Sequence, residues 1–238
     1  MDLALSGWTI VFDLDGTLID TAPDLIGTAQ ALLSQRGLAP VPENLLRPEI
    51  SNGSRRMMAT AFAHHGLTPD DAELDAVFAD FLAHYRAHIA DRSQPFPHIG
   101  EVLATLKAAG AKLAVCTNKA ETPALELLEL LNMRATFDFI AGRDTFPVCK
   151  PNPAHLTETI ARAGGAPERA IMVGDSETDA ATAQAAGIPI IAVTFGYTSV
   201  PVQALGCDAV IDSYTEFMPA LAALIAASNA PEASPPAP

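Results

Sequence analysis

Cysteine is scarce in this chain, with 3 residues among 238. An odd and sparse set of thiols does not fit the paired framework of a disulfide-stabilised secreted protein. A chain of this length can also bury a large enough core to fold without disulfides or a structural metal. Because the N-terminal sequence lacks the basic start and cleavage site of a signal peptide as well, we expect a cytoplasmic protein.

Basic residues are also few, since 14 Lys and Arg stand against 28 Asp and Glu, for a net charge of −14. Such a negative field repels nucleic acid and anionic membrane surfaces. No apolar run approaches the roughly 20 residues of a membrane span. We therefore expect neither nucleic acid nor a membrane as partner, and a small anionic substrate must be held by local cations, N–H donors or a metal ion.

Short apolar segments alternate with helical patterns along most of the chain. The apolar segments predict buried strands at residues 8–12, 112–116, 139–141, 170–173, 188–193 and, more weakly, 209–211. The intervening patterns predict helices at residues 101–109, 121–131, 153–163 and 176–186. This alternation is typical of an α/β protein with a Rossmann-like parallel sheet that has helices on both faces.

Residues 21–92 break the alternation, because they contain several helical patterns and no convincing strand. We expect an inserted all-helical domain there, with residues 1–20 and 93–227 forming the core domain. One of the three apolar stripes in the insertion consists of Val77, Phe81, Leu82 and Tyr85. We assign these stripes to core packing, without chemistry. Residues 228–238 are rich in Ala, Pro and Ser and are expected to be disordered.

The first strand segment runs directly into Asp13-Leu14-Asp15-Gly16-Thr17. In extended backbone Asp13 and Asp15 project to the same side, and Gly16 allows a tight turn whose N–H groups can face an anion. Two carboxylates this close repel each other unless a cation bridges them or one keeps a proton. Mg²⁺, with its preference for oxygen ligands, would provide such a bridge. A purely structural turn rich in Asp and Gly is the alternative.

A second acidic motif, Gly174-Asp175-Ser176-Glu177-Thr178-Asp179, follows the strand segment at residues 170–173. Ser176 is a candidate helix cap, which would leave Asp175 at the strand end and Asp179 in the first helical turn. The helix dipole alone also favours acidic residues at such a position.

Two further polar groups also follow strand segments. Thr117 and Asn118 come after the strand at 112–116, and Lys150 precedes Pro151. Thr117 offers a hydroxyl and a nearby N–H, and Lys150 offers a point charge suited to phosphate. Singly, a helix cap and a solvated lysine would explain them. In combination they indicate a binding site, because ligands of parallel sheets bind at the carboxyl ends of the strands.

Taken in order, the four motifs resemble those of the haloacid dehalogenase-like hydrolases in residue type, order and spacing. The resemblance spans nearly the whole chain. The helical insertion is similar to the cap domain of the phosphoglycolate phosphatase-like subfamily. The resemblance implies a Mg²⁺-dependent phosphatase for a small phosphorylated metabolite, and it leaves open whether the protein is a monomer or a homodimer.

The resemblance also implies a role for each motif residue. Asp13 would be the nucleophile that forms an aspartyl-phosphate, and Asp15 would be the general acid and base. The implied Mg²⁺ ligands are Asp13, the backbone carbonyl of Asp15, and Asp175. The implied supporting residues are Asp179, Gly16 and Thr17. The implied phosphate-binding residues are Thr117, Asn118 and Lys150.

A bound phosphate would leave this site with excess negative charge, so a further cation above the substrate is expected from the insertion. The insertion contains six arginines and no lysine. Arg55 is the preferred candidate, because it follows the turn-like sequence Ser51-Asn52-Gly53-Ser54 and leads into a helix. An arginine on a solvated helix face explains it equally well.

The resemblance favours 2-phosphoglycolate as the single best substrate. A sugar phosphate such as N-acetylmuramic acid 6-phosphate is an alternative substrate. A phosphosugar mutase is disfavoured, because Thr17 stands where such relatives usually carry Val. A catalytically silent phosphometabolite-binding protein is less consistent with the presence of both Asp13 and Asp15.

Overall fold

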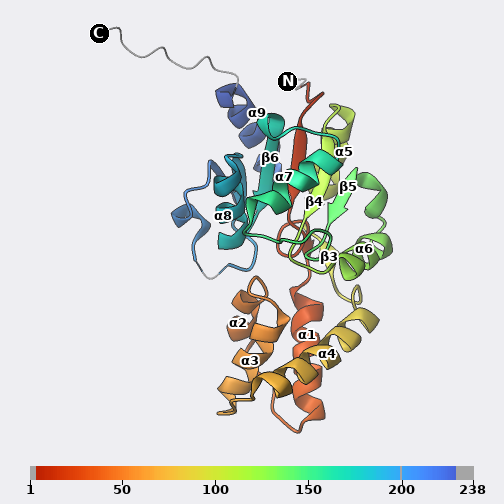
Figure 1. The fold of residues 1–238 in the computed structure, drawn as a ribbon, viewed down its shortest axis with the longest axis vertical. Coiled ribbons are helices and arrows are strands. Elements are labelled where there is room, and N and C mark those ends of the chain that lie inside the picture. The colour runs from red at the N-terminus through yellow and green to blue at the C-terminus, as the bar shows by residue number, and fades with distance from the viewer. Residues whose placement is uncertain (1–3, 199, 229–238) are drawn as a thin grey trace, which may run out of the picture.

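A six-stranded parallel sheet forms the centre of the protein (Figure 1). The computed structural model describes residues 4–198 and 200–228. Across the sheet the strands are ordered β5-β4-β1-β6-β7-β8. Their bounds are β1 (Thr9–Phe12), β4 (Lys112–Cys116), β5 (Phe139–Ala141), β6 (Ala170–Gly174), β7 (Ile190–Val193) and β8 (Ala209–Ile211). The predicted α/β class with a parallel sheet is confirmed.

Helices cover both faces of this sheet, because successive side chains on a strand point to opposite faces. On β1, Ile10 and Phe12 belong to one apolar cluster, which includes side chains of α5, α6 and α9. Val11 belongs to a second cluster with α7 and α8. The bounds are α5 (Ile99–Ala108), α6 (Glu121–Leu130), α7 (Pro153–Arg162), α8 (Glu177–Ala186) and α9 (Phe217–Ser228). Short 3-10 helices are η2 (Arg134–Thr136), η3 (Pro167–Arg169), η4 (Val202–Ala204) and η5 (Tyr214–Glu216).

Four of these five α-helices lie where the sequence pattern predicts them, and α9 was not predicted. Its sequence is apolar almost throughout, so it has no polar face from which a helical period can be recognised. Ser228, the first residue of the expected disordered tail, is the last residue of this helix. The rest of that segment, 229–238, lies outside the described residues.

The chain between β1 and α5 forms the expected helical insertion, which lies below the sheet in Figure 1. Its elements are α1 (Ala22–Gln35), α2 (Glu43–Leu46), the 3-10 helix η1 (Arg47–Glu49), α3 (Ser54–His64) and α4 (Asp71–Ala87). The predicted apolar stripe on α4 is largely buried, through Val77, Phe81 and Tyr85. Asp70 begins this helix with a capping box, in which its side chain accepts from the Glu73 N–H.

The two chain crossings between the core and the insertion pair with each other. β2 (Ile19–Asp20) and β3 (Gln94–Pro95) form a small antiparallel sheet. The sequence pattern did not predict it, since two-residue strands carry no periodicity and one of them contains a proline. The expected domain boundaries at 20/21 and 92/93 stay predictions, and both fall beside this strand pair.

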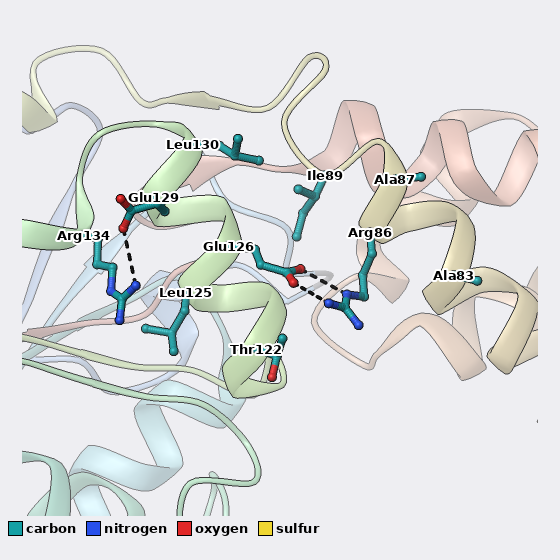
Figure 2. Close-up of a pocket in the computed structure, with 10 residues that line it drawn as sticks. All are labelled: Ala83, Arg86, Ala87, Ile89, Thr122, Leu125, Glu126, Glu129, Leu130 and Arg134. Carbon is teal, nitrogen blue, oxygen red and sulfur yellow. Dashed lines mark hydrogen bonds and ion pairs between the residues drawn. The ribbon is translucent and has the colours of Figure 1, made fainter.

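The insertion also contacts the core between α4 and α6 (Figure 2). Arg86 on α4 donates from Nε to Oε2 of Glu126 on α6 at 3.1 Å, and its Nη2 pairs with Oε1 of the same carboxylate. Both side chains line a groove of about 700 Å³ together with Ile89 and Leu125. This ion pair therefore joins the insertion to the core at some distance from the strand pair.

The cysteines Cys116, Cys149 and Cys207 are free thiols. Cys116 is buried, and that burial raises the pKa of its thiol to about 12. A thiol with such a pKa is a small apolar side chain and no nucleophile. Within residues 4–198 and 200–228, every helix is too short or too polar to cross a membrane.

Candidate active site

The four polar motifs meet at the carboxyl ends of β1, β4 and β6. β1 lies between the other two strands, so the chain leaves the sheet in different directions on its two sides and a crevice opens there. A cavity of about 660 Å³ occupies this position, with Asp13, Thr117 and Lys150 on its core side. Side chains of α3 and α4 form the opposite wall. The cavity therefore lies between the core and the helical insertion.

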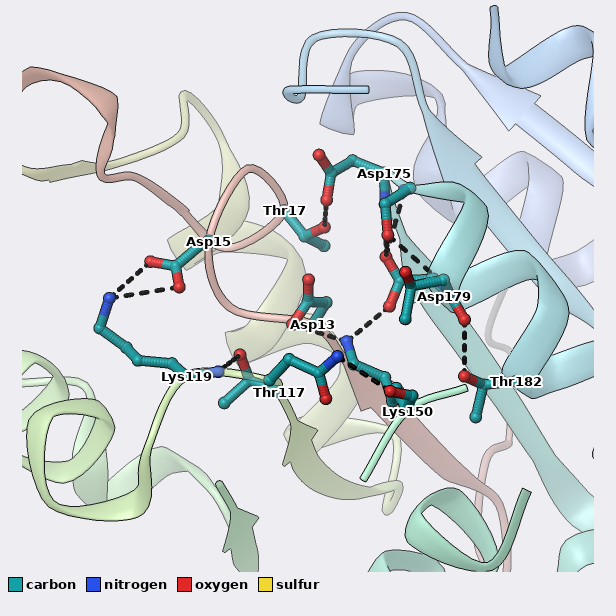
Figure 3. A network of polar contacts seen from close by, with 12 residues as sticks. Asp13, Asp15, Thr17, Thr117, Lys119, Lys150, Asp175, Asp179 and Thr182 are labelled. Atoms are coloured by element: carbon teal, nitrogen blue, oxygen red, sulfur yellow. Dashed lines mark hydrogen bonds and ion pairs between the residues drawn. The ribbon is translucent and has the colours of Figure 1, made fainter. Parts of the chain in front are cut away.

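Three carboxylates form a buried cluster, of which Asp13 lines this cavity (Figure 3). Asp13, Asp175 and Asp179 each place an oxygen within 4.8 Å of the others. Burial, reinforced by the charge of Asp179, raises the pKa of Asp13 to about 6, although Lys150 opposes the shift. Burial and the charges of Asp179 and Asp13 also raise the pKa of Asp175 well above its ordinary value. The positive charge near the cluster is therefore too small to balance its three carboxylates.

Lys150 supplies part of the missing positive charge. Its side chain is 2% exposed, and its Nζ lies 2.9 Å from Asp13 Oδ1 and 2.6 Å from Asp179 Oδ1. Burial alone would lower the pKa of Lys150, but the charges of Asp13 and Asp179 outweigh it and raise the pKa above the ordinary value. Lys150 is therefore a fixed cation beside Asp13.

His155 fixes the backbone that carries this lysine, and the sequence analysis missed it. The Lys150 N–H donates to His155 Nδ1 at 3.1 Å, and His155 Nε2 lies 3.0 Å from the Gly142 carbonyl oxygen. These contacts assign the proton to Nε2. Burial lowers the pKa of His155, which keeps the ring neutral. In the sequence, His155 is a histidine five residues after Lys150. Its position alone does not distinguish it from a histidine that merely packs in the core.

Asp175 and Asp179 are held by the start of α8. As predicted, Ser176 caps this helix, and Asp179 accepts hydrogen bonds from the Ser176 hydroxyl at 2.6 Å and the Ser176 N–H at 3.1 Å. Asp175 Oδ1 accepts from the Thr17 hydroxyl at 3.0 Å, and its Oδ2 accepts from the Tyr197 N–H at 2.7 Å. Asp179 thus accepts hydrogen bonds from Lys150, from Ser176 and from the Asp175 N–H, whereas Asp175 accepts fewer and keeps acceptor capacity for another partner.

Two glycines leave no space for a side chain next to Asp175. A Cβ on Gly16 or on Gly196 would overlap the Asp175 carboxylate. Gly16 also has a φ of +81°, a backbone conformation that other residues adopt at a cost. The predicted supporting residues Gly16 and Thr17 therefore both contact Asp175.

The donor set of this cluster fits a divalent cation. Three carboxylates converge at a distance that a single ion can bridge, and oxygen is the ligand that hard cations prefer. Burial, together with the charges of the neighbouring carboxylates, raises the pKa of both Asp13 and Asp175, and a cation between them would favour their charged forms. The structure therefore supports a site for a divalent metal ion.

Thr117 and Asn118 lie beside Lys150, at the end of β4. Thr117 Oγ1 accepts from the Lys119 N–H at 3.1 Å. Asn118 Nδ2 donates to the Lys150 carbonyl oxygen at 3.0 Å and so ties two loops together. Its Oδ1 is buried and has no hydrogen-bond partner among the described residues.

Asp15 points away from the carboxylate cluster, toward a lysine that the sequence analysis left without a role. Lys119 Nζ donates to Asp15 Oδ1 at 2.9 Å and to Oδ2 at 3.2 Å (Figure 3). Thr21, which directly precedes α1, donates from its hydroxyl to Asp15 Oδ1 at 2.7 Å. The available signal was the position of Lys119, immediately after the Thr117-Asn118 motif at a strand end.

Arg55, the predicted substrate-binding cation of the insertion, lines the cavity but is occupied by other residues. Its Nε donates to Asp75 Oδ1 and its Nη2 to Asp71 Oδ1, both at 2.9 Å. Its side chain is 41% exposed. A contact between Arg55 and substrate stays a prediction, and it would compete with two existing ion pairs.

Comparisons with known proteins agree with this geometry. A family model described as haloacid dehalogenase-like hydrolase matches residues 10–193, which contain all four motifs and the insertion. The chain is 43% identical over 227 residues to a phosphoglycolate phosphatase of Caulobacter vibrioides, covering 95% of this chain and 96% of that protein. It is 48% identical over 205 residues to a phosphoglycolate phosphatase of Mesorhizobium japonicum, covering 86% and 90%. The crystal structure of a predicted phosphoglycolate phosphatase from Haemophilus somnus matches with a TM-score of 0.82 and 28% identity, covering 92% of this chain and 98% of that one.

Proposed function

Because the chain belongs to the haloacid dehalogenase-like hydrolases, we propose that it hydrolyses 2-phosphoglycolate to glycolate and phosphate. Relatives that share 43% and 48% of its residues over most of both chains carry the name phosphoglycolate phosphatase. The observation that supports a phosphatase most strongly is that Asp13, which lines the cavity together with Lys150, also belongs to the buried carboxylate cluster. This arrangement offers a nucleophile, a phosphate-binding cation and a metal site at one place.

Asp13 is proposed as the nucleophile. Its carboxylate would attack phosphorus, forming a bond between Asp13 and the phosphoryl group while the bond to the leaving oxygen breaks. Lys150 at 2.9 Å would hold the carboxylate in place and offset the charge of the phosphoryl oxygens. Thr117 and Asn118 would contact the same oxygens from the end of β4, as the resemblance implies.

Asp15 is proposed as the general acid and base. It would donate a proton to the leaving glycolate oxygen and later accept one from the water that hydrolyses the aspartyl-phosphate. Thr21 and Lys119 orient its carboxylate. Both contacts originate outside the β1 loop, so the position of Asp15 depends on the junction between core and insertion.

Mg²⁺ is the proposed metal, with Asp13, the backbone carbonyl of Asp15 and Asp175 as ligands and Asp179 as support. The bound ion would neutralise charge on the phosphoryl group and on the carboxylates. Thr17, Tyr197 and the two glycines around Asp175 would keep that carboxylate in a ligating orientation.

The proposed partner is a small phosphorylated metabolite, and the cytoplasm is the proposed location. The free thiols are consistent with a reducing compartment.

Phosphate release from a panel of phosphomonoesters tests the proposed function. The panel contains 2-phosphoglycolate, N-acetylmuramic acid 6-phosphate and simple sugar phosphates, each assayed with Mg²⁺ and with EDTA. We expect metal-dependent release that is greatest for 2-phosphoglycolate. Greater release from another compound would reassign the substrate, and interconversion of sugar phosphates without free phosphate would indicate a mutase.

A further inference from the structure

Lys119 is a buried cation in the wall of the cavity. It follows β4, and its side chain is 6% exposed. Its backbone is fixed on both sides, because its N–H donates to Thr117 Oγ1 and its carbonyl oxygen accepts from the Arg143 N–H at 2.8 Å. A lysine is rarely buried to this extent without a charged partner. Lys119 therefore occupies a defined position at the boundary between core and insertion.

The surroundings of Lys119 keep it charged. Burial alone would lower its pKa, but the charge of Asp15 outweighs that effect and raises the pKa above the ordinary value. Its Nζ also lies 4.6 Å from the centre of the Tyr85 ring, at a distance typical of a cation–π contact. The ammonium carries three N–H donors and makes two contacts with Asp15, and the neighbouring Tyr85 side chain also helps to raise its pKa.

Tyr85 brings a hydroxyl donor to the same part of the cavity. This residue lies on α4 of the insertion, lines the cavity and is 3% exposed. Its hydroxyl is buried and has no hydrogen-bond partner among the described residues. Burial raises the pKa of this phenol to about 12, so the proton stays on the oxygen. A buried hydroxyl without a partner is costly, which suggests that a ligand supplies the acceptor.

We propose that Lys119 and the Tyr85 hydroxyl bind the carboxylate of a short phosphorylated carboxylic acid whose phosphate lies at Asp13. The proposal rests on the proposed function and names the group that distinguishes its substrate. A carboxylate offers two oxygens with free lone pairs, which match one ammonium N–H and one phenol O–H. One donor comes from the core and one from the insertion, so the bound carboxylate would join the two.

The position of Lys119 favours a short substrate. In 2-phosphoglycolate a single methylene group separates the ester oxygen from the carboxylate. Lys119 lies one hydrogen bond from Asp15, the residue proposed to act on that ester oxygen. Arg55, the alternative cation from the insertion, already donates to Asp71 and Asp75. A carboxylate one methylene group from the phosphate is therefore better placed for Lys119.

The charge balance of the site also favours a role for Lys119 in binding a second anionic group. The site holds four carboxylates, from Asp13, Asp15, Asp175 and Asp179, and a divalent cation with Lys150 would offset three of them. Lys119 supplies the remaining positive charge, without which a substrate with a second anionic group would enter a site of net negative charge.

Two matched lysine variants and two matched substrates test the proposal. Lys119→Gln removes the cation, and Lys107→Gln is the control, because Lys107 is partly exposed and pairs with Asp138 at 3.0 Å outside the cavity. The substrates are 2-phosphoglycolate and 2-hydroxyethyl phosphate, which carries a neutral CH₂OH group in place of the carboxylate. We expect Lys119→Gln to lower kcat/KM for 2-phosphoglycolate roughly ten- to one-hundred-fold more than for 2-hydroxyethyl phosphate. Lys107→Gln should change neither value.

An equal loss for both substrates would overturn the proposal, because it would mean that Lys119 acts only by orienting Asp15. The two substrates are compared within each variant, so a loss of folded protein lowers both rates equally and leaves the ratio of the two kcat/KM values unchanged. Lys119→Arg, which keeps the charge, should restore part of the preference for the carboxylate.

A binding measurement separates this proposal from the proposed function. Binding of each phosphomonoester is measured by calorimetry in the Asp13→Asn background, with Lys119 intact or replaced by Gln. We expect tighter binding of 2-phosphoglycolate only when Lys119 is present, and several-fold weaker binding when Tyr85→Phe removes the hydroxyl. If the wild-type protein released no phosphate from either compound, the proposed function would fail while this binding difference would still support the carboxylate site. Equal binding of both compounds with Lys119 intact would refute the site.

Discussion

The Asp175 carboxylate is held from several directions. Thr17 and the Tyr197 N–H bind its two oxygens, and Gly16 and Gly196 close the space around it. These contacts come from two separate parts of the chain, the loop after β1 and the loop after β7. A metal ligand held in this way needs little reordering when the ion binds, which favours affinity.

Gly196→Ala tests this role of the glycine. A Cβ there would overlap the Asp175 carboxylate and force it to shift. We expect the apparent affinity for Mg²⁺, measured by activity against metal concentration, to fall about ten- to one-hundred-fold, the range seen when partners of metal ligands are changed. Gly100→Ala in α5 is the control, because a Cβ there meets nothing within 4 Å and alanine favours helix. Unchanged metal affinity in Gly196→Ala would show that Asp175 is no ligand or that the loop adapts freely.

Some residues could be assigned to the site from the sequence, and others could not. Asp13, Asp175 and Lys150 were predictable, because each directly follows or lies near a strand end within a recognisable motif. Lys119 and Tyr85 were not, because their proximity depends on how α4 packs over the core. Arg55 was predicted to bind substrate, but in the structure it pairs with Asp71 and Asp75. These ion pairs depend on the packing of α3 against α4, which the sequence does not reveal.

At the scale of elements, Asp24 holds the two chain crossings together. This residue at the start of α1 is 4% exposed, and its carboxylate accepts hydrogen bonds from the N–H groups of Arg92 and Ser93 and from the Ser93 hydroxyl. The Ser93 contacts are both 2.7 Å. Asp24 thereby connects the beginning of the insertion to its end.

Asp24→Ala is expected to lower the free energy of unfolding by about 2–4 kcal/mol, because it leaves buried N–H groups without acceptors. Urea unfolding measures the change. Asp80→Ala is the control, since Asp80 is exposed and its pair with Arg36 at 2.9 Å should contribute less than about 1 kcal/mol. Similar losses for the two variants would contradict the structural role of Asp24.

Tyr197, which follows β7 in the core, connects the core to the start of α1. Its hydroxyl oxygen accepts from the Thr21 N–H at 2.6 Å and the Ala22 N–H at 3.0 Å, and the hydroxyl donates to Asp20. The start of α1 is thus capped by a residue 176 positions away in sequence. No local pattern predicts such a cap. The central strands β1, β4 and β6, by contrast, were predicted because each is a continuous and largely buried apolar run.

The whole molecule carries a net charge of −14, and among its described residues Asp13, Asp175 and Asp179 form a buried carboxylate cluster. Cation binding should therefore contribute to folding as well as to catalysis. In the folded state the pKa of Asp13 is raised to about 6, whereas an unfolded chain titrates Asp near 3.9. Between these values the folded protein keeps a proton that the unfolded chain has released. The Asp13 contribution to the free energy of unfolding consequently falls as pH rises from about 4 to about 6 without metal.

Protons and the metal ion should therefore compete for the carboxylate cluster, so the stabilisation by metal should depend on pH. We expect saturating Mg²⁺ to raise Tm at about pH 7.5 by an amount that corresponds to roughly 2–4 kcal/mol, and much less at about pH 5, where protons compete with the ion. EDTA should have the opposite effect. In Asp13→Asn both the metal effect and the fall in stability between pH 4 and 6 should shrink. A metal effect of equal size at both pH values would place the ion elsewhere.

The most direct test compares phosphate release from 2-phosphoglycolate by the wild-type protein and by Asp13→Asn in the presence of Mg²⁺. The change keeps the size of the side chain, so we expect the fold, followed by circular dichroism, to be retained. Turnover should occur in the wild type and be lost in Asp13→Asn, because the amide cannot form the aspartyl-phosphate. Equal turnover by the two proteins, or no release by the wild type, would contradict the account.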